Sequence, residues 1–493
     1  MRARALLPLM LLTMLSTGVT AALRAQDDVA RLVTALLGPT PMLEDLGALT
    51  DGIGGRATGS EANLAAVDWA LARFRAAGVD ARREAFQMPA FWLERSASVV
   101  VRGAARAFSP RVAAMPFSAA TPAGGLTAPL VDGGRGTEAD FARLGARARG
   151  AWVIVETEEL TDIPGLFREY AEATLIEQRA FAAGVAGVVY EGSRPNDLLY
   201  RHNASLGPAN TRPLMVMERD GASRILRLLR AGQALTLTAQ IDVQSGGPYE
   251  SYNVVAEIRG ATRPDEIVVI GAHLDSWDLG DGALDNGCNV SLVIDIARQV
   301  RRLGLRPART IRFVLFNGEE QGLVGSWKYT VSHLDEMDRT VLASSFDIGT
   351  GRITGFFTGG RPEVAAAVTR ALEPVRGLGP FEQVDVPIVG TDNFDFMMQG
   401  VANIVGNQES ANYGPNYHAR SDTYDKANAQ QLRLNAAIAA AVIYSFANSD
   451  VTFPRQTRAE LEQLVRSTDL ADQMRTFGIL QAWESGARGR ARN

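Results

Sequence analysis

The sequence predicts an α/β protein with a mixed, mostly parallel central sheet, helices on both of its faces, and an inserted smaller β-rich domain. Residues 267–270 form a continuous apolar run, which is typical of a strand buried on both faces. Residues 290–300 follow with apolar side chains at helical spacing. Between residues 104 and 246, short apolar runs alternate with many glycines and prolines, which indicates the insertion.

Length and composition narrow the class of protein. The chain has 493 residues, of which 46% are hydrophobic and 21% charged, as expected for a globular protein with more than one domain. The net charge of -5 argues against a surface that binds nucleic acid. Cys288 is the single cysteine, so the chain cannot form an internal disulfide.

Residues 1–25 have the pattern of a secretory signal peptide. Arg2 and Arg4 supply the charged end, residues 5–15 the apolar core, and alanines near residue 25 the cleavage region. A retained membrane anchor is the alternative, but the apolar core is short for a transmembrane helix. We therefore expect a secreted or periplasmic protein without membrane attachment after cleavage.

The elements before residue 250 are predicted in order. Residues 27–103 are expected to form two helices and a strand, with Ser60 as the cap of the second helix. The glycine-rich residues 54–59 are interpreted as a turn, because no strand precedes them and no lysine follows. In the insertion we expect a helix at 169–183 and strands at 128–131, 151–156, 184–190, 213–217 and 235–241.

The main sheet continues after residue 250, with further strands expected at 252–258, 310–316, 341–346 and 401–405. A long helix with alanine-rich faces is predicted at 430–446. The last residues are expected to form a short helix at 458–467 and a basic, mobile tail.

The loop after the strand at 267–270 is unusually acidic. It holds one imidazole and several carboxylates, namely His273, Asp275, Asp278, Asp281 and Asp285. In an open α/β sheet this loop lies at the carboxyl edge of the strands, where such folds bind ligands. Carboxylates so close together repel one another unless a cation lies among them. A solvated acidic turn is the alternative.

Two further strands also end in acids, and together with this loop they predict a metal site. The strand at 310–316 is followed by Glu319 and Glu320, and the strand at 341–346 by Asp347; His418 is available from a later loop. Imidazole and carboxylate bind zinc well, and a bridging carboxylate can hold two ions about 3.5–4 Å apart. A pair of zinc ions is suited to hydrolysis, and this reaction also needs a carboxylate outside the coordination sphere to move a proton. The adjacent Glu319 and Glu320 fit this division of roles.

The motifs that carry these residues resemble those of the cocatalytic zinc exopeptidases, a family that includes leucyl aminopeptidase and glutamate carboxypeptidase. The resemblance rests on GAHLDS, DNG, NGEEQG, the strand-end Asp347 and YHARSDT. The longer SWDLGDGALDNG and LRPARTIRFVLF look most like the plasma glutamate carboxypeptidase (carboxypeptidase Q) branch. In the insertion, AFAAGVAGVVYEG and RPLMVMERDGASRILRLLRAG are similar to a protease-associated domain.

The resemblance implies a role for each site residue. The expected ligands of two zinc ions are His273 and Asp347 for one ion, Glu320 and His418 for the other, and Asp285 between them. Glu319 would be the general base and acid, and Asp275 would orient the imidazole of His273. The peptide bond between Asp285 and Asn286 is expected to be cis.

Substrate contacts are predicted less directly. Asp392 and Asn393 lie in a stretch that resembles the family's pocket loop, and Tyr417 is an aromatic candidate for the pocket wall; packing is the alternative for each. Asp422 either supports His418 or serves as a cap or surface residue. No arginine or acid is plainly placed to bind a terminus of a peptide, so amino-, carboxy- and dipeptidase activity all stay open.

The resemblance implies an exported, zinc-dependent metallo-exopeptidase of the zinc exopeptidase fold, acting on short peptides or dipeptides. A homodimer is compatible with the sequence. The alternatives are a catalytically silent, receptor-like protein and a one-zinc glutaminyl cyclase. The expected segments are a signal peptide (1–25), two catalytic segments (26–103 and 247–450), a protease-associated insertion (104–246) and a C-terminal extension (451–493).

Overall fold

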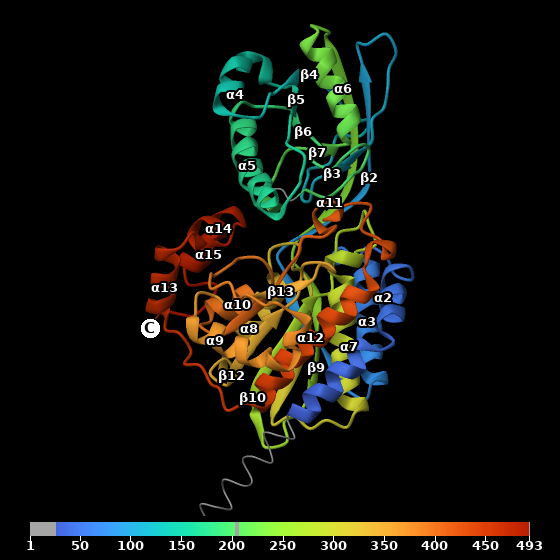
Figure 1. Cartoon of the computed structure of the whole chain (residues 1–493). Coiled ribbons are helices and arrows are strands. Elements are labelled where there is room, and N and C mark those ends of the chain that lie inside the picture. The colour runs from blue at the N-terminus through green and yellow to red at the C-terminus, as the bar shows by residue number, and fades with distance from the viewer. Residues whose placement is uncertain (1–25, 203–206, 493) are drawn as a thin grey trace, which may run out of the picture.

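The computed structural model describes residues 26–202 and 207–492. The predicted signal peptide, residues 1–25, lies outside these residues. Figure 1 shows two lobes, each built around one sheet, with the large lobe below and the second lobe above it. Among the described residues, no helix combines the length and the apolar character that a membrane crossing requires.

The large lobe is built on a seven-stranded mixed sheet. Its strands are β1 (Asp80–Met88), β9 (Tyr249–Ile258), β10 (Arg263–His273), β11 (Arg309–Phe316), β12 (Thr340–Ser345), β13 (Ile353–Phe357) and β14 (Asn403–Gln408). Their order is β1-β9-β11-β10-β12-β14-β13. The four central strands from β11 to β14 run parallel, and the outer strands pair antiparallel. The predicted α/β fold with a mostly parallel centre is therefore confirmed.

The apolar run of β10 serves two cores, one on each face of the sheet. Val268 and Ile270 pack on the side of α7 and α12, whereas Ile267 and Val269 pack on the side of α8 and α10. Successive side chains of a strand point to opposite faces, so a strand covered on both faces needs apolar residues throughout. Besides a helix over residues 26–37, the helices of this lobe include α2 (Met42–Thr50), α3 (Glu61–Ala76), α7 (Cys288–Arg302), α8 (Val324–Ser332), α9 (Pro362–Ala371), α10 (Asn393–Met398), α11 (Tyr413–Asn416) and α12 (Ala429–Asn448).

The predicted cap of α3 is confirmed. The side chain of Ser60 accepts a hydrogen bond from the main-chain N–H of Asn63 at 3.0 Å. This bond satisfies one of the free N–H groups in the first turn of the helix. The glycine-rich residues before Ser60 lie beside the acidic loop, where the main-chain N–H of Arg56 donates a hydrogen bond to Ser276 Oγ at 3.0 Å.

The second lobe is built on another seven-stranded sheet, in the order β2-β8-β4-β5-β6-β7-β3. It begins with β2 at Phe91, earlier than the change of composition at residue 104, because β2 is a long strand that pairs with β8 along its length. The strands are β2 (Phe91–Arg102), β3 (Val112–Ala114), β4 (Leu126–Asp132), β5 (Trp152–Val155), β6 (Gly187–Glu191), β7 (Leu214–Met217) and β8 (Leu235–Gly246). The helices are α4 (Glu138–Leu144), α5 (Ile163–Ala182) and α6 (Arg219–Arg230).

The C-terminal residues are helical and packed, so the prediction of a mobile tail is wrong. The helices α13 (Arg458–Ser467), α14 (Leu470–Thr476) and α15 (Leu480–Glu484) lie beside the large lobe, below α5 (Figure 1). Trp483 is buried, and Arg488 donates two hydrogen bonds of 2.7 Å to the buried carboxylate of Asp395. A basic residue that looks solvated in the sequence is therefore an internal partner of an acid.

Candidate metal centre

The sheet order brings three predicted segments to one edge of the large lobe. β10 lies between β11 and β12, so the loops that follow these three strands are neighbours. His273 ends β10, Glu320 follows β11, and Asp347 follows β12. His418 enters from the loop after α11. All four side chains and that of Asp285 are buried.

These five residues form two groups that share one carboxylate. His273 Nε2 lies 2.9 Å from Asp347 Oδ1 and 3.1 Å from Asp285 Oδ1. His418 Nε2 lies 2.8 Å from Glu320 Oε2 and 3.3 Å from Asp285 Oδ2. Within each group of three, the possible ligand atoms lie within 4.8 Å of one another. The two oxygens of Asp285 therefore face two different imidazoles.

The donor set fits a pair of cations. Asp285 Oδ2, Glu320 Oε1 and His418 Nε2 are buried, and none of them makes a hydrogen bond within the described part of the chain. A buried polar atom without a partner is costly, and a cation would satisfy all three. Imidazole nitrogen and carboxylate oxygen are ligands that zinc prefers.

The site also controls the protonation of its histidines. Burial lowers the pKa of His418 to about 4, although the carboxylate of Asp285 opposes this shift. The imidazole is then neutral near pH 7, as a metal ligand must be. Burial would also lower the pKa of His273, but the carboxylates of Asp347 and Glu319 raise it well above its usual value.

The buried carboxyl groups at and near the candidate metal site repel one another. Burial raises the pKa of Glu320 well above its usual value, and the nearby Asp285 adds to this shift. Burial likewise raises the pKa of Glu319, with Asp347 and Glu320 adding to the shift and His273 opposing it. The pKa of the buried Asp392 is raised for the same primary reason. Such an accumulation of buried acids is typical of a functional site.

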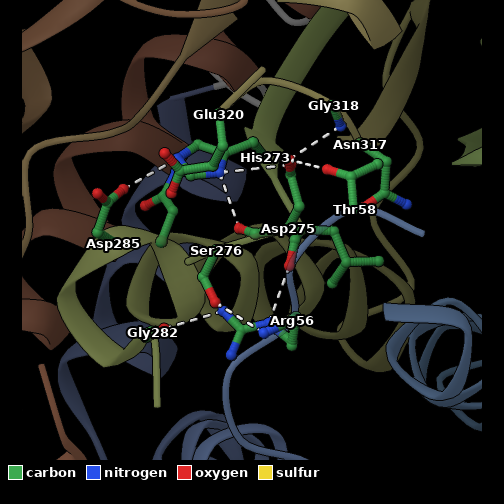
Figure 2. Close-up of polar contacts among 12 residues, drawn as sticks. Arg56, Thr58, His273, Asp275, Ser276, Gly282, Asp285, Asn317, Gly318 and Glu320 are labelled. Atoms are coloured by element: carbon green, nitrogen blue, oxygen red, sulfur yellow. Dashed lines mark hydrogen bonds and ion pairs between the residues drawn. The ribbon is translucent and has the colours of Figure 1, made fainter. Parts of the chain in front are cut away.

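Asp275 lies next to His273, as Figure 2 shows. Its main-chain oxygen contacts the imidazole, whereas its carboxylate contacts other residues. His273 Nδ1 lies 2.9 Å from the main-chain oxygen of Asp275 and 3.7 Å from its carboxylate Oδ1. The other carboxylate oxygen accepts hydrogen bonds from Thr58 Oγ at 2.6 Å and from the N–H of Gly318 at 3.0 Å. Asp275 therefore joins His273 to the loop that carries Glu319 and Glu320.

Arg56 is a structural residue of the site that the sequence analysis did not find. Its buried guanidinium donates hydrogen bonds to the main-chain oxygens of Leu274, Asp281 and Gly282 at 2.9, 2.7 and 2.9 Å. Figure 2 shows the contact between Arg56 and Gly282. It thus ties the start of the acidic loop to the segment before Asp285. The glycine-rich turn around Arg56 gave no sign of these contacts, because its partners lie more than 200 residues away, with a separation of 218 for Leu274.

Asp422 is buried beside the shared carboxylate and does not contact the solvent as a surface cap would. Its two oxygens accept hydrogen bonds from the main-chain N–H groups of Leu284 at 2.6 Å and Asp285 at 3.1 Å. Burial raises the pKa of Asp422 to about 7. The peptide bond between Asp285 and Asn286 is cis, in agreement with what the family resemblance implies.

A cavity of about 480 Å³ opens beside the five buried residues. Glu319 and Tyr417 line it, and the hydroxyl of Tyr417 lies 2.8 Å from that of Tyr170 in the second lobe. Gly390 and Thr391 also line it, but the predicted substrate contacts Asp392 and Asn393 are buried outside the lining, and Asn393 donates a hydrogen bond of 2.9 Å to Asn403.

Comparisons with known proteins agree with this geometry. Residues 253–443 match the family described as Peptidase family M28. Carboxypeptidase Q of Mus musculus is 27% identical over 84% of this chain and 87% of its own length, and that of Xenopus laevis is 31% identical over 48% and 50%.

A solved structure is similar over most of the chain. The crystal structure of a Peptidase M28 precursor from Shewanella amazonensis SB2B has a TM-score of 0.80 and 28% identity. The similarity covers 88% of this chain and 99% of the other. The geometry of the site and these similarities agree: residues 253–443 match peptidase family M28, and most of the chain is similar to carboxypeptidase Q and to an M28 peptidase precursor.

Proposed function

We propose that the protein is an exported two-zinc metallopeptidase that removes residues from the ends of short peptides or splits dipeptides. The observation that carries this proposal is the position of Asp285, whose two oxygens face His273 and His418 at 3.1 and 3.3 Å. A carboxylate shared in this way is what two cations about 3.5–4 Å apart require. The silent and one-zinc alternatives explain this arrangement less well.

Each side chain has a distinct role in this proposal. His273 and Asp347 would hold one zinc ion, Glu320 and His418 would hold the other, and Asp285 would be shared between them. Ions held there would supply a bound water of lowered pKa and would polarise the scissile carbonyl. Asp275, Arg56 and Asp422 keep the ligand-bearing loops in place through the hydrogen bonds described above.

Glu319 is proposed as the proton carrier. It lines the cavity and belongs to neither group of potential ligands. In the proposed reaction its carboxylate takes a proton from the attacking water and delivers that proton to the leaving amine.

The cavity lining favours peptides with apolar side chains. Leu166, Phe167, Ile388, Phe477 and Ile479 contribute apolar walls from three separate parts of the chain. No lysine or arginine is among the described residues that line it, so no cationic side chain is placed to bind a peptide carboxylate. We therefore favour an aminopeptidase over a carboxypeptidase.

The remaining assignments are part of the same proposal. The pattern of residues 1–25 favours export, and the lobe formed by residues 91–246 is proposed to be an inserted protease-associated domain. The first and last strands of this lobe, β2 and β8, pair with each other, as expected for a domain inserted at one place in the chain. The extension after residue 450 contributes Phe477 to the cavity and is proposed to be part of the catalytic unit.

Metal content and turnover test the proposal together. We expect two zinc ions per chain, hydrolysis of free apolar dipeptides, loss of hydrolysis with a chelator, and weak activity on amino-blocked dipeptides. Glu319→Gln should retain both ions and lose about 10²–10⁴-fold in kcat, because only proton transfer is removed. A wild-type protein that binds one ion, or that cyclises an N-terminal glutamine without hydrolysing dipeptides, would contradict the proposal.

A further inference from the structure

The second lobe contacts the loop that carries His418 through its main chain. Tyr200 and Ala419 form an antiparallel bridge. The N–H of Arg201 donates to the oxygen of His418 at 2.9 Å, and the N–H of Arg420 donates to the oxygen of Leu199 at 2.9 Å. A short segment of the second lobe, residues 199–201, therefore pairs with residues 418–420 of the large lobe like a strand.

This segment also contacts the imidazole of His418. Its Nδ1 lies 3.2 Å from the main-chain oxygen of Arg201. A hydrogen bond donated from Nδ1 to this oxygen leaves Nε2 unprotonated and aimed at Glu320 and Asp285. The φ angle of His418 is 56°, in the left-handed region that few residues other than glycine adopt. Neighbouring contacts must therefore hold the loop in this conformation.

The side chain of Arg201 attaches the segment to the acidic loop. Its Nε and Nη2 donate hydrogen bonds of 2.8 Å to the two carboxylate oxygens of Asp278, which follows His273 in the sequence. Its Nη1 donates to the oxygen of Ala114 at 2.8 Å and also to Glu94, both in the second lobe. The guanidinium is buried, so these bonds are shielded from solvent.

A second group of contacts supports Tyr417, the residue before His418. Arg194 Nη2 donates to the main-chain oxygen of Tyr417 at 3.0 Å. The ring of Tyr417 stacks on that of His418 with centroids 3.7 Å apart. Tyr170 of α5 contacts the hydroxyl of Tyr417, as described above. The second lobe therefore contacts the His418 loop both at the main chain of the loop and at the side chain of Tyr417.

From these contacts we infer that Arg201 is a positioning residue for the half of the metal centre formed by Glu320 and His418, and that the second lobe is required for full occupancy of that half. The inference rests on the proposed two-metal function. The half formed by His273 and Asp347 is held by Asp275 and Arg56, which lie in the large lobe. Disturbing Arg201 should therefore weaken one metal site and spare the other.

The test uses the full chain with Arg201→Met, which removes the charge and keeps the length of the side chain, and Arg201→Lys, which keeps the charge. Arg230→Met is the matched control, because Arg230 lies in the same lobe and forms an exposed pair with Asp132 and Glu156. Zinc is titrated into each metal-free protein, and zinc positions are read from anomalous diffraction at one equivalent and at saturation.

For Arg201→Met we expect the affinity for one zinc ion to fall about 10–100-fold, as losses behind a metal ligand usually do. The affinity for the other ion should stay within about threefold of the wild type. At limiting zinc, density should remain beside His273 and be lost beside His418. Hydrolysis should recover at high zinc, Arg201→Lys should lie between the variant and the wild type, and Arg230→Met should match the wild type.

If Arg201→Met does not fold, Asp278→Asn decides the question, because it weakens the same clamp from the large lobe and leaves the buried arginine in place. Equal losses at both sites, or no loss at either site in a folded variant, would overturn the inference. This failure differs from a failure of the proposed function, which would appear as fewer than two zinc ions or no hydrolysis in the wild type.

Discussion

The C-terminal extension is expected to contribute directly to stability, and Arg488 is the residue that tests this. Its guanidinium is buried, donates two hydrogen bonds of 2.7 Å to Asp395, and donates two more of 3.1 Å to the main-chain oxygens of Gly322 and Leu323. These last two residues follow Glu320 closely. Arg488 therefore holds the extension against the loop that carries two of the proposed catalytic-site residues.

Arg488→Met removes the cation and leaves the buried carboxylate of Asp395 without its ionic partner. Removing one partner of a buried pair costs about 3–5 kcal/mol, which corresponds to roughly a hundred- to several-thousand-fold in the folding equilibrium. We expect a loss of this size in urea unfolding of the zinc-loaded chain. The double variant Arg488→Met with Asp395→Asn should recover part of it, because the uncompensated charge is gone.

Arg492→Met is the control for Arg488. Arg492 is exposed and pairs with Glu462 at 3.1 Å on the surface, and such pairs contribute about 0–1 kcal/mol. Its loss should therefore leave the free energy of unfolding almost unchanged. If Arg488→Met changed stability no more than Arg492→Met did, the extension would not be an integral part of the fold.

Two further predictions concern the cavity and the metal. Phe477→Ala removes an apolar wall of the cavity that also contacts Phe167 and Tyr170. We expect kcat/KM to fall about tenfold for dipeptides with large apolar side chains and to fall less for alanyl dipeptides. An equal fall for both kinds of dipeptide would contradict the proposed apolar subsite. In the metal-free protein, burial raises the pKa of Glu320, and that of Asp422 to about 7. From about pH 4 upward to these raised values, Glu320 and Asp422 in the folded metal-free chain retain protons that they have lost in the unfolded chain, so the contribution of these two groups to stability falls as the pH rises. Zinc needs deprotonated ligands, so the increase in Tm on adding zinc should be larger at about pH 8 than at about pH 5; an increase that shrinks with rising pH would contradict this.

The parts of the fold that depend on local pattern were predictable from the sequence. The apolar run of β10 predicted a strand covered on both faces, and its two packing sides are observed. Ser60 predicted the start of α3 because a cap acts within one turn. Acids at the ends of neighbouring strands indicated a crevice, because parallel strands place their carboxyl ends at one edge.

The supports of the site were not predictable, because each depends on a partner far away in the chain. Arg56 binds carbonyls of the acidic loop 218–226 residues later, and the Arg201 clamp on Asp278 spans 77 residues. A single arginine in a glycine-rich turn or a loop has no periodicity that would indicate such a partner. The same holds for Arg488, whose basic surroundings suggested a solvated tail and concealed a buried ion pair.

The central claim is that two zinc ions share the carboxylate of Asp285, and anomalous diffraction at the zinc edge on crystals of the zinc-loaded protein tests it most directly. We predict two peaks about 3.5–4 Å apart, one beside His273 and Asp347 and one beside Glu320 and His418, both in contact with Asp285. A single peak at saturating zinc, or two peaks of which one does not touch Asp285, would contradict the claim.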